Sequence, residues 1–340
     1  MRRAVWIVAG ALALVAAGAA AWWSMADLPA RPVRAERQAC ALPAAPASSP
    51  HPGMVWVPPG SFDIGDTVYP EEAPRRARRV EGFWMDRTEV TNDEFSAFVA
   101  ATNYVTVAER PVDTAMNPGL PAAMQQPGAV VFVMPSAVQA QGDMRQWWRY
   151  LPGANWRHPG GPKTSITGHG AFPVVAVTIE DAQAYARWKG RALPSEAQWE
   201  WAARAARAEP RPAHEQPKDA NTWQGVFPVM NSGEDGFIGL APVGCYAPNA
   251  LGLHDMIGNV WELTADAWTP HHREADTPPP DQVPAGMRTP AAAQQVIKGG
   301  SFLCAPNYCM RYRAGAREPQ DRDLGASHLG FRTILSAPGP

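Results

Sequence analysis

Two cysteines near the carboxyl end are the residues of this chain best suited to metal or redox chemistry. Cys304 and Cys309 are five residues apart in segment 298–313. At that spacing their side chains would point away from each other on a helix and to opposite faces of a strand, so the sulfur atoms can meet only across a turn. Ala305-Pro306-Asn307 supplies residues typical of such a turn. We therefore expect the two sulfur atoms to act as one unit.

The cysteine pair suits Cu(I) better than zinc. A closed zinc site needs four ligands and no third Cys or His lies nearby, whereas two soft sulfur atoms can hold linear Cu(I). Arg311 and Arg313 could favour the thiolate form that metal binding requires. The spacing alone leaves a second interpretation open, in which Cys304 and Cys309 form a structural disulfide that closes a short loop.

The other two cysteines carry less information. Cys40 lies in a stretch rich in Pro, Ala and Ser, and we interpret it as a spare thiol. Cys245 is predicted to be a small buried residue. Four cysteines are too few for a disulfide scaffold in a domain of this size.

Composition predicts a globular protein with little regular secondary structure. With 340 residues, of which 46% are hydrophobic and 18% charged, the chain can bury a substantial core. The 36 prolines and 29 glycines indicate many turns, and 14 tryptophans supply bulky rings to pack between them. A net charge of -2, without a basic run interleaved with aromatics, argues against nucleic acid as a partner.

The amino-terminal region predicts entry into a membrane. Residues 4–23 carry no charge, and as a helix they would span about 30 Å, the thickness of the hydrocarbon layer. We expect residues 1–26 to be a membrane anchor or a cleaved signal segment, residues 27–52 a Pro/Ala-rich linker, and residues 53–340 the folded domain. The positive charges at the start would keep that end in the cytoplasm, so the domain is expected on the extracytoplasmic side.

The elements that must position the cysteine pair have local signals in the sequence. Three capping boxes predict helices, and three short apolar runs predict strands. The boxes are Thr91-x-x-Glu94, Thr178-x-x-Asp181 and Ser195-x-x-Gln198, and the runs are 54–57, 130–133 and 174–177. No internal repeat is visible in the sequence.

Three further groups receive structural interpretations. Glu196, Glu200 and Arg204 recur at a spacing of four, which is typical of a salt-bridged helix surface. The adjacent His271 and His272 are interpreted as part of a surface loop, because neighbouring side chains rarely converge on one metal ion. The tryptophans at 147, 148 and 156 are predicted to be core residues.

Seven motifs together closely resemble the formylglycine-generating enzymes, the sulfatase-modifying factor family, over about residues 53 to 335. The resemblance implies an α+β protein with the fold of that family, a variant of the C-type-lectin-like fold with low regular secondary-structure content. The motifs are Met54-Val-Trp-Val-Pro-Pro-Gly-Ser-Phe62, 83–91, 147–159, Arg191-Ala-Leu-Pro-Ser-Glu196 with its continuation to Glu200, Gly258-Asn-Val-Trp-Glu262, 298–313 and Leu324-Gly-Ala-Ser-His-Leu-Gly-Phe-Arg332.

The resemblance also implies a reaction. Family members oxidise a cysteine inside a Cys-x-Pro-x-Arg type motif of an unfolded or nascent sulfatase to formylglycine, using copper and molecular oxygen. By position, Cys304 and Cys309 would hold Cu(I), and Ser301 and Tyr308 would line the reaction pocket with His328 close by. Several family members have Asn where this chain has His328.

Two sets of oxygen ligands match the calcium positions of the family, and hard oxygen ligands in loops suit Ca²⁺. On spacing alone, an ordinary solvated acidic turn is the better interpretation of either set. The first set is Asn221, Thr222, Asp235 and Phe237, and the second is Asp255, Gly258, Val260 and Glu262, with Thr222, Phe237, Gly258 and Val260 contributing carbonyl groups.

Two other functions remain open at the level of sequence. One is a non-catalytic peptide-binding module of the same fold, in which Cys304 and Cys309 form a permanent disulfide. The other is an iron-dependent sulfoxide synthase, which would need an attached histidine-rich helical domain. The eight histidines of this chain form no such cluster, so we favour the oxidase.

Overall fold

The computed structural model describes residues 39–40, 50–112, 114, 119–140, 142–205, 215–272, 294–336 and 338–339. The predicted membrane segment 1–26 and most of the predicted linker 27–52 lie outside these residues. All the elements below belong to one compact unit, which extends from residue 37 to residue 340. Within the described part of the chain, every helix is too short or too polar to cross a membrane.

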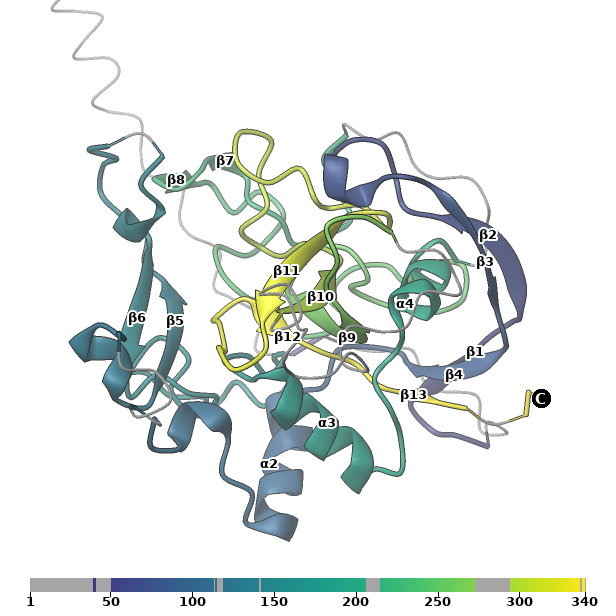
Figure 1. The fold of residues 1–340 in the computed structure, drawn as a ribbon, viewed down its shortest axis with the longest axis horizontal. Coiled ribbons are helices and arrows are strands. Elements are labelled where there is room, and N and C mark those ends of the chain that lie inside the picture. The colour runs from purple at the N-terminus through teal and green to yellow at the C-terminus, as the bar shows by residue number, and fades with distance from the viewer. Residues whose placement is uncertain are drawn as a thin grey trace, which may run out of the picture. The chain divides into compact units, whose positions relative to one another are not determined.

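In the part of the chain that the structure describes, short strands form five small sheets, of which the largest has four strands in the order β11-β10-β9-β12 (Figure 1). A three-stranded sheet has the order β1-β4-β13, and three two-stranded ribbons pair β2 with β3, β5 with β6 and β7 with β8. The strands are β1 Met54–Val57, β2 Gly60–Ile64, β3 Arg76–Val80, β4 Phe83–Asp86, β5 Gly128–Phe132, β6 Trp148–Pro152, β7 Gly225–Val226, β8 Met230–Asn231, β9 Trp261–Ala267, β10 Gln294–Lys298, β11 Arg317–Asp321, β12 Leu329–Gly330 and β13 Ile334–Leu335.

The three α-helices of the described residues begin where the capping boxes predict. In each one the capping hydroxyl accepts a hydrogen bond from the third helical amide, and the third side chain bonds back to the cap. The helices are α2 Asn92–Thr102, α3 Ile179–Trp188 and α4 Glu196–Ala203, and short 3₁₀ turns occupy η1 Pro70–Glu72, η2 Val107–Glu109, η3 Ala122–Gln125 and η4 Met144–Gln146.

Two of the three predicted strands are confirmed, as β1 and as β5. The prediction for 174–177 is wrong, although that segment is fully buried. Its amides donate to two different segments, Val174 to the carbonyl of Val90 and Ala176 to that of Ala326. Ala176 also has a φ of +57°, which interrupts an extended chain. The apolar character of residues 174–177 reflects their burial in the core and not the hydrogen-bond pairing of a β-strand.

The largest hydrophobic cluster lies between α2, α3 and the four-stranded sheet. Phe95 of α2 and Tyr185 of α3 pack against Phe331, which follows β12, and Phe98 of α2 packs against both Phe95 and Tyr185. The same cluster includes Cys304 and Cys309, so the cysteine pair is packed against the core of the domain.

Helix α4 presents charged residues to the interior, contrary to the predicted surface salt bridges. Glu196 and Glu200 are buried, and the Lys298 Nζ of β10 lies 2.9 Å from Glu200 Oε2. Arg317 of β11 approaches Glu196 to 2.9 Å. Burial raises the pKa of Glu196, but the nearby Arg317 and Lys298 more than offset this and hold it well below its usual range. The ion pairs join α4 to the four-stranded sheet.

The prediction of a surface loop is also wrong for His272. This residue is 5% exposed, and its Nε2 lies 3.3 Å from Glu196 Oε1. The histidine belongs to the same buried charged cluster, which the sequence spacing of α4 does not reveal.

A disulfide joins Cys40 to Cys245, 205 positions away. The interpretation of Cys40 as a spare thiol is therefore wrong, and Cys245 is half-buried and bonded instead of being a small core residue. Nothing in the sequence around either cysteine indicates the partner, because the two are brought together by the tertiary fold. The bond makes Cys40, in the predicted linker, covalently part of the domain.

Candidate active site

The cysteine pair lies in the connection between β10 and β11, residues 299–316, which we call the cysteine loop. Two glycines open this loop with φ values of +98° at Gly299 and +75° at Gly300. A Cβ on Gly300 would lie 2.9 Å from the carbonyl oxygen of Arg311 and 3.3 Å from the sulfur of Cys304. The loop can therefore fold back against the sulfur atom only because residue 300 is glycine.

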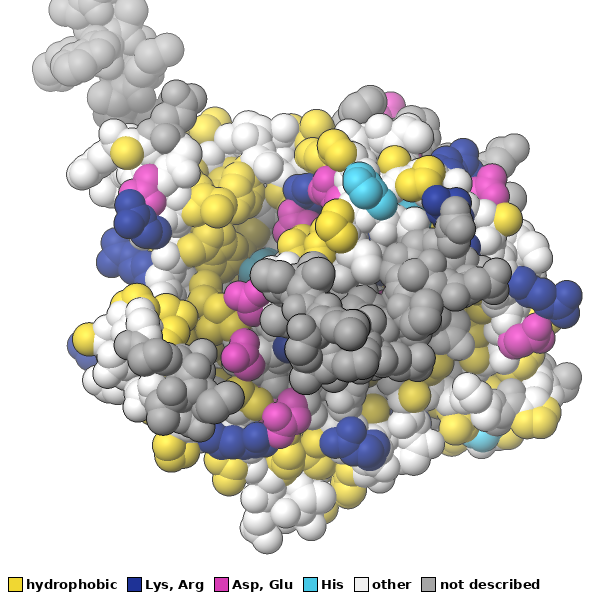
Figure 2. All heavy atoms as spheres, in the orientation of Figure 1, with side chains coloured by type: hydrophobic (Ala, Val, Ile, Leu, Met, Phe, Trp, Pro, Cys, Tyr) yellow, Lys and Arg dark blue, Asp and Glu magenta, His cyan; other side chains and the backbone are white. Residues whose placement is uncertain are grey.

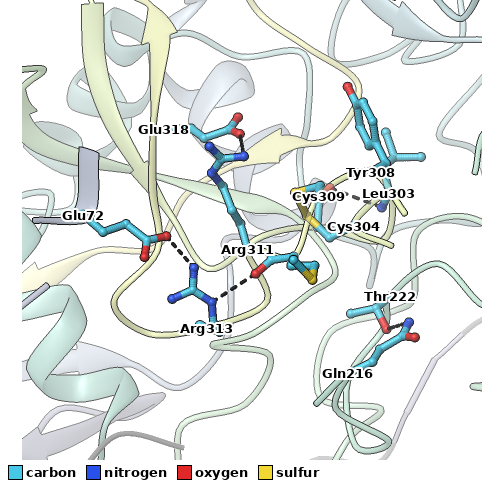
Figure 3. Close-up of a disulfide and its surroundings, with 12 residues drawn as sticks. Glu72, Gln216, Thr222, Leu303, Cys304, Tyr308, Cys309, Arg311, Arg313 and Glu318 are labelled. Atoms are coloured by element: carbon cyan, nitrogen blue, oxygen red, sulfur yellow. Dashed lines mark hydrogen bonds and ion pairs between the residues drawn. A yellow bond between two sulfur atoms is a disulfide. The ribbon is translucent and has the colours of Figure 1, made fainter. Parts of the chain in front are cut away.

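The predicted turn between the cysteines is confirmed. The amides of Tyr308 and Cys309 both donate to the carbonyl of Ala305, at 3.1 and 2.9 Å, and the Cα atoms of the cysteines are 4.6 Å apart. Figure 3 shows the sulfur atoms of Cys304 and Cys309 joined as a disulfide. Both residues are nearly buried, at 1% and 6% exposure.

The two arginines after the pair do not support the expected role in thiolate formation. Arg311 forms ion pairs with Glu71 and Glu318, and Arg313 pairs with Glu72 and with Asp66 at 2.6 Å. Their guanidinium groups extend away from the sulfur atoms in Figure 3. Since carboxylates balance both charges, the arginines hold the end of the loop against η1 and β11.

Tyr308, which directly precedes Cys309, is 36% exposed and belongs to an aromatic cluster. Its ring stacks on Phe227 with centroids 4.0 Å apart, and its hydroxyl accepts a hydrogen bond of 3.2 Å from Trp148 Nε1. Trp147 meets the same ring edge-on. Asn307 fixes this arrangement, because its side chain exchanges hydrogen bonds with the backbone of Phe227. The cysteine loop is thereby attached to the β7–β8 ribbon.

The other predicted pocket residues lie in two different settings. Ser301 is completely buried, and its hydroxyl accepts a bond of 3.3 Å from the amide of Leu303 inside the cysteine loop. His328 packs against Trp148 with ring centroids 4.6 Å apart, and its Nδ1 is buried without a hydrogen-bond partner among the described residues. Burial lowers the pKa of His328 to about 3, so its imidazole is neutral near pH 7.

The structure brings the first predicted calcium set together. The carboxylate of Asp235 accepts hydrogen bonds from the amides of Thr222, at 3.0 Å, and Phe237, at 3.2 Å. Burial raises the pKa of Asp235, and among the described residues no Lys or Arg forms an ion pair with it. Asn221 adjoins this group and is 1% exposed. A half-buried carboxylate without a paired Lys or Arg among the described residues fits a calcium ion.

The second calcium set fits less well. Both oxygens of Glu262 are bound by the guanidinium of Arg332, and one also accepts from Trp199 Nε1 at 2.8 Å. Asp255 accepts a hydrogen bond of 2.6 Å from the Gly244 amide, and burial raises its pKa to about 6. Gly258 and Val260 lie in the turn leading into β9, and the Gly258 amide donates to Gly299. Calcium at Glu262 would have to displace Arg332.

Among the described residues, no three His, Cys, Asp or Glu side chains converge as a metal site. The cysteine pair nevertheless fits copper by the chemistry of its donors. Two buried sulfur atoms in contact match the soft and low-coordinate environment of Cu(I), and no oxygen ligand is needed.

The sequence did not single out the aromatic walls of the site. Phe227 carried no signal, because it precedes a proline in an irregular segment, and Trp148 was assigned to the core. Trp147 and Trp156 are buried, as predicted, at 5% and 2% exposure, while Trp148 is only half-buried and lines the site. A pair of adjacent tryptophans at the start of a strand would place one ring on each face, which is the signal that could have identified Trp148.

Residues 40–337 match the family model of the sulfatase-modifying factor enzyme 1-like domain. A formylglycine-generating enzyme of Mycobacterium tuberculosis is 47% identical over 291 residues, which cover 83% of this chain and 97% of the relative. The formylglycine-generating enzyme of Bos taurus is 40% identical over 312 residues, or 88% of this chain and 79% of the relative. A Mus musculus relative named inactive C-alpha-formylglycine-generating enzyme 2 is 34% identical over 85% of this chain and 87% of its own.

Among solved structures, that of PvdO from Pseudomonas aeruginosa superposes with a TM-score of 0.56 at 22% identity, covering 83% of this chain and 93% of the other. At this identity the likeness concerns the fold alone. It confirms the α+β fold class, with few helices and several small sheets, that the sequence motifs predicted.

Proposed function

The chain belongs to the sulfatase-modifying factor enzyme 1-like family, and on this premise we propose that it oxidises a cysteine of a sulfatase-type polypeptide to formylglycine. The target cysteine would lie in a Cys-x-Pro-x-Arg type motif, and molecular oxygen would accept the electrons. The observation that carries the proposal is the buried pair Cys304 and Cys309 in a loop whose Tyr308 is partly exposed, in a chain 47% identical to a formylglycine-generating enzyme.

We propose that Cys304 and Cys309, in the reduced state, hold Cu(I). When bound, copper would supply the one-electron chemistry that allows oxygen to oxidise a thiol-bearing carbon. Two thiolates offer soft ligands, and a substrate thiolate would be of the same type. The packing of the pair against the hydrophobic core keeps water from the sulfur atoms.

The surrounding side chains have roles in binding and orientation. The stack of Tyr308 on Phe227 provides a flat apolar wall next to the pair, and the Trp148 indole donates to the Tyr308 hydroxyl and fixes its direction. His328 is neutral across pH 5 to 8, because its pKa is lowered to about 3. It can therefore exchange a hydrogen bond with a bound peptide without adding charge to an apolar site.

The proposal is tested with a peptide that contains the Cys-x-Pro-x-Arg motif. The reduced protein is incubated with Cu(I), oxygen and the peptide, and the products are analysed by mass spectrometry. We expect conversion of the cysteine to the aldehyde only when copper, oxygen and protein are all present. Unchanged peptide in the complete mixture would refute the activity.

A second candidate function is a peptide-binding module without catalysis. The disulfide between Cys304 and Cys309 and the resemblance to a relative named inactive both favour it. Titration of the reduced protein with Cu(I) separates the two candidates. An oxidase should bind one copper ion per chain, whereas a module with a permanent disulfide should bind none after mild reduction.

We further propose that the domain acts on the extracytoplasmic side of a membrane, anchored by the uncharged segment 4–23. The Cys40–Cys245 disulfide supports this location, because such bonds persist in oxidising compartments. Protease added to spheroplasts should then digest the domain, while a cytoplasmic marker stays intact. Protection of the domain would contradict the location.

For the metal ions other than copper, we propose that Ca²⁺ binds at Asp235 together with Asn221 and the carbonyls of Thr222 and Phe237. Support comes from the half-buried Asp235 carboxylate, which pairs with no Lys or Arg of the described residues and whose pKa is raised by desolvation. The set around Asp255 remains a second candidate, subject to the competing ion pair of Glu262 with Arg332.

A further inference from the structure

Exposed hydrophobic side chains are concentrated around the cysteine loop. Of the nine large hydrophobic residues that are exposed in the described part of the chain, seven lie in three segments next to the cysteine pair. Tyr308 is one of them. The other six, which we call the flanking surface, are Val133, Met134, Val138, Met144, Val226 and Met230.

Contacts between the three segments show that the segments meet at Tyr308. The hydroxyl of Tyr308 lies 3.8 Å from the sulfur of Met144, and the Tyr308 ring stacks on Phe227, which adjoins Val226 in the β7–β8 ribbon. Figure 2 shows hydrophobic side chains gathered along a hollow on the face that carries the β5–β6 and β7–β8 ribbons in Figure 1. The flanking surface thus continues the wall of the candidate active site.

The segment between β5 and β6 is held in place by its own polar side chains. Gln146 accepts from the amide of Gln139 at 2.7 Å and donates to the carbonyl of Ala140 at 2.6 Å. Asp143 caps η4 by accepting from the Arg145 amide. Because the segment is braced in this way, Met144 and its apolar neighbours are exposed by a defined structure.

The β7–β8 ribbon is fixed in the same manner. Trp223 Nε1 donates to the carbonyl of Met230 at 2.8 Å, and Val226 pairs with Met230 across the ribbon. Both side chains therefore stand on a short ribbon that Asn307 ties to the cysteine loop. Val226 is 51% exposed and Met230 is 53% exposed. Large apolar side chains exposed side by side lower the solubility of a protein, and such patches commonly mark binding surfaces.

We propose that the flanking surface binds the apolar residues that stand on either side of the substrate motif in an extended polypeptide. This inference rests on the proposed function. Folded proteins bury their apolar residues, whereas an unfolded chain offers them at many positions. Three of the six residues are methionines, whose flexible and polarisable side chains adapt to varied partners. The surface thus suits many sequences that share only apolar character.

The test compares two peptides with the same Cys-x-Pro-x-Arg centre, one flanked by Leu, Val and Phe and the other by Ser, Gly and Gln. KM and kcat are measured for each, and binding of versions with Ser in place of the target Cys is measured by fluorescence anisotropy. We expect a lower KM and tighter binding for the apolar peptide at equal kcat. In the double variant Met144→Gln/Met230→Gln this preference should fall by about tenfold.

A matched pair of variants controls for loss of surface hydrophobicity in general. Val226→Thr changes a residue of the flanking surface and Val105→Thr changes a residue far from it in sequence, and both valines are 51% exposed. Only Val226→Thr should raise the KM of the apolar peptide, while the polar peptide should respond to neither.

Each other outcome contradicts one of the two ideas. Equal KM values for both peptides, or equal effects of Val226→Thr and Val105→Thr, would overturn the flanking surface while leaving the oxidase proposal intact. If the anisotropy measurement shows tighter binding of the apolar peptide but neither peptide is converted, the oxidase proposal is refuted and the flanking surface is supported. Loss of self-association in Val226→Thr at unchanged peptide binding would assign the surface to a second copy of this chain.

Discussion

Cys304 and Cys309 illustrate how one residue pair can serve two chemistries. When oxidised, they close a loop of five positions, and when reduced, they present two sulfur atoms side by side. The turn at Ala305 and the glycine at position 300 hold the pair in contact in either case. The redox state, which the local backbone does not determine, therefore decides between a structural and a metal-binding role.

Replacement of either cysteine distinguishes the two roles. If the pair holds copper, Cys304→Ala or Cys309→Ala should abolish peptide conversion and copper binding, since half of the ligands are lost. The fold should persist, with a loss of at most about 2 kcal/mol for so short a loop. Conversion at the wild-type rate in either variant would refute the catalytic assignment.

At His328 the neutral imidazole makes stability depend on pH. Its pKa is about 3 in the folded protein, below the usual 6.5, so the unfolded chain binds more protons between these values. The contribution of His328 to stability is complete above pH 6.5 and is lost as the pH falls, with a slope of up to about 1.4 kcal/mol per pH unit.

Thermal melting of the wild type and His328→Asn between pH 7.5 and 4 measures this effect. The wild type should lose stability more steeply than the variant on acidification, and the two curves should run in parallel above pH 7. Parallel curves throughout the range would show that the imidazole is not held neutral by the fold.

At the level of secondary-structure elements, α4 depends on its buried charges. Glu200 accepts from Lys298 on β10 and from Arg204 one turn further along the helix. The carboxylate also accepts from the amide of Gly65, which follows β2. One side chain thus connects the helix to two sheets. Its removal would take the nearer carboxylate from Lys298, whose other carboxylate contact is Glu196 at 3.5 Å, and would take the Glu200 carboxylate from buried Arg204.

Glu200→Gln should therefore destabilise the fold by about 3 to 5 kcal/mol, as is usual when one member of a buried ion pair is removed. Chemical denaturation gives the free energy of unfolding. Glu81→Gln is the control, because Glu81 pairs with Arg79 on the surface with both side chains 77% exposed, and its loss should stay within about 0.5 kcal/mol. Similar losses in both variants would mean that the buried network does not bind α4 to the sheets.

The loop that contains Asp235 should be stabilised by calcium. A chelator should lower the melting temperature of the wild type, because a ligand at a hundredfold excess over its dissociation constant adds about 2.7 kcal/mol. Asp235→Asn should melt at the same temperature with and without calcium, while Asp255→Asn reports on the second set separately. An unchanged melting temperature of the wild type in the presence of the chelator would exclude both calcium sites.

On the scale of the whole molecule, the Cys40–Cys245 disulfide closes the longest covalent loop in the described structure. Cys245 lies in a stretch whose neighbours reach both proposed calcium sets, since Gly244 donates to Asp255 and the Tyr246 hydroxyl donates to the carbonyl of Asp235. The bond therefore joins the amino-terminal end of the domain to the loops that surround the predicted calcium positions.

Cys245→Ser should lower the free energy of unfolding by about 2 to 4 kcal/mol under oxidising conditions. Reduction of the wild type should produce a similar loss, and reduction of the variant should add none from this bond. A non-reduced digest should contain the peptide that links Cys40 and Cys245. Its absence, together with equal stability of the two proteins, would rule out the bond.

Features set by neighbouring residues could be predicted directly from the sequence. The capping boxes at Thr91, Thr178 and Ser195 each satisfy helix amides within three positions, so they begin the helices wherever the chain later packs. The turn between Cys304 and Cys309 belongs to the same class, because two amides after it bond to a carbonyl within four positions.

Features that depend on distant partners were decided only by the tertiary structure. The spacing of Glu196 and Glu200 would be the same on a solvent-exposed helix face as on a buried one. Their burial is made possible by Lys298 and Arg317, about a hundred positions away, which neutralise the two carboxylates. The disulfide of Cys40 and the stack of Phe227 on Tyr308 likewise join segments with no local signal for each other. A sequence pattern reports which residues prefer burial, but only the packing of the whole chain supplies the neighbour that makes burial of a charge, or a hollow for a peptide, favourable.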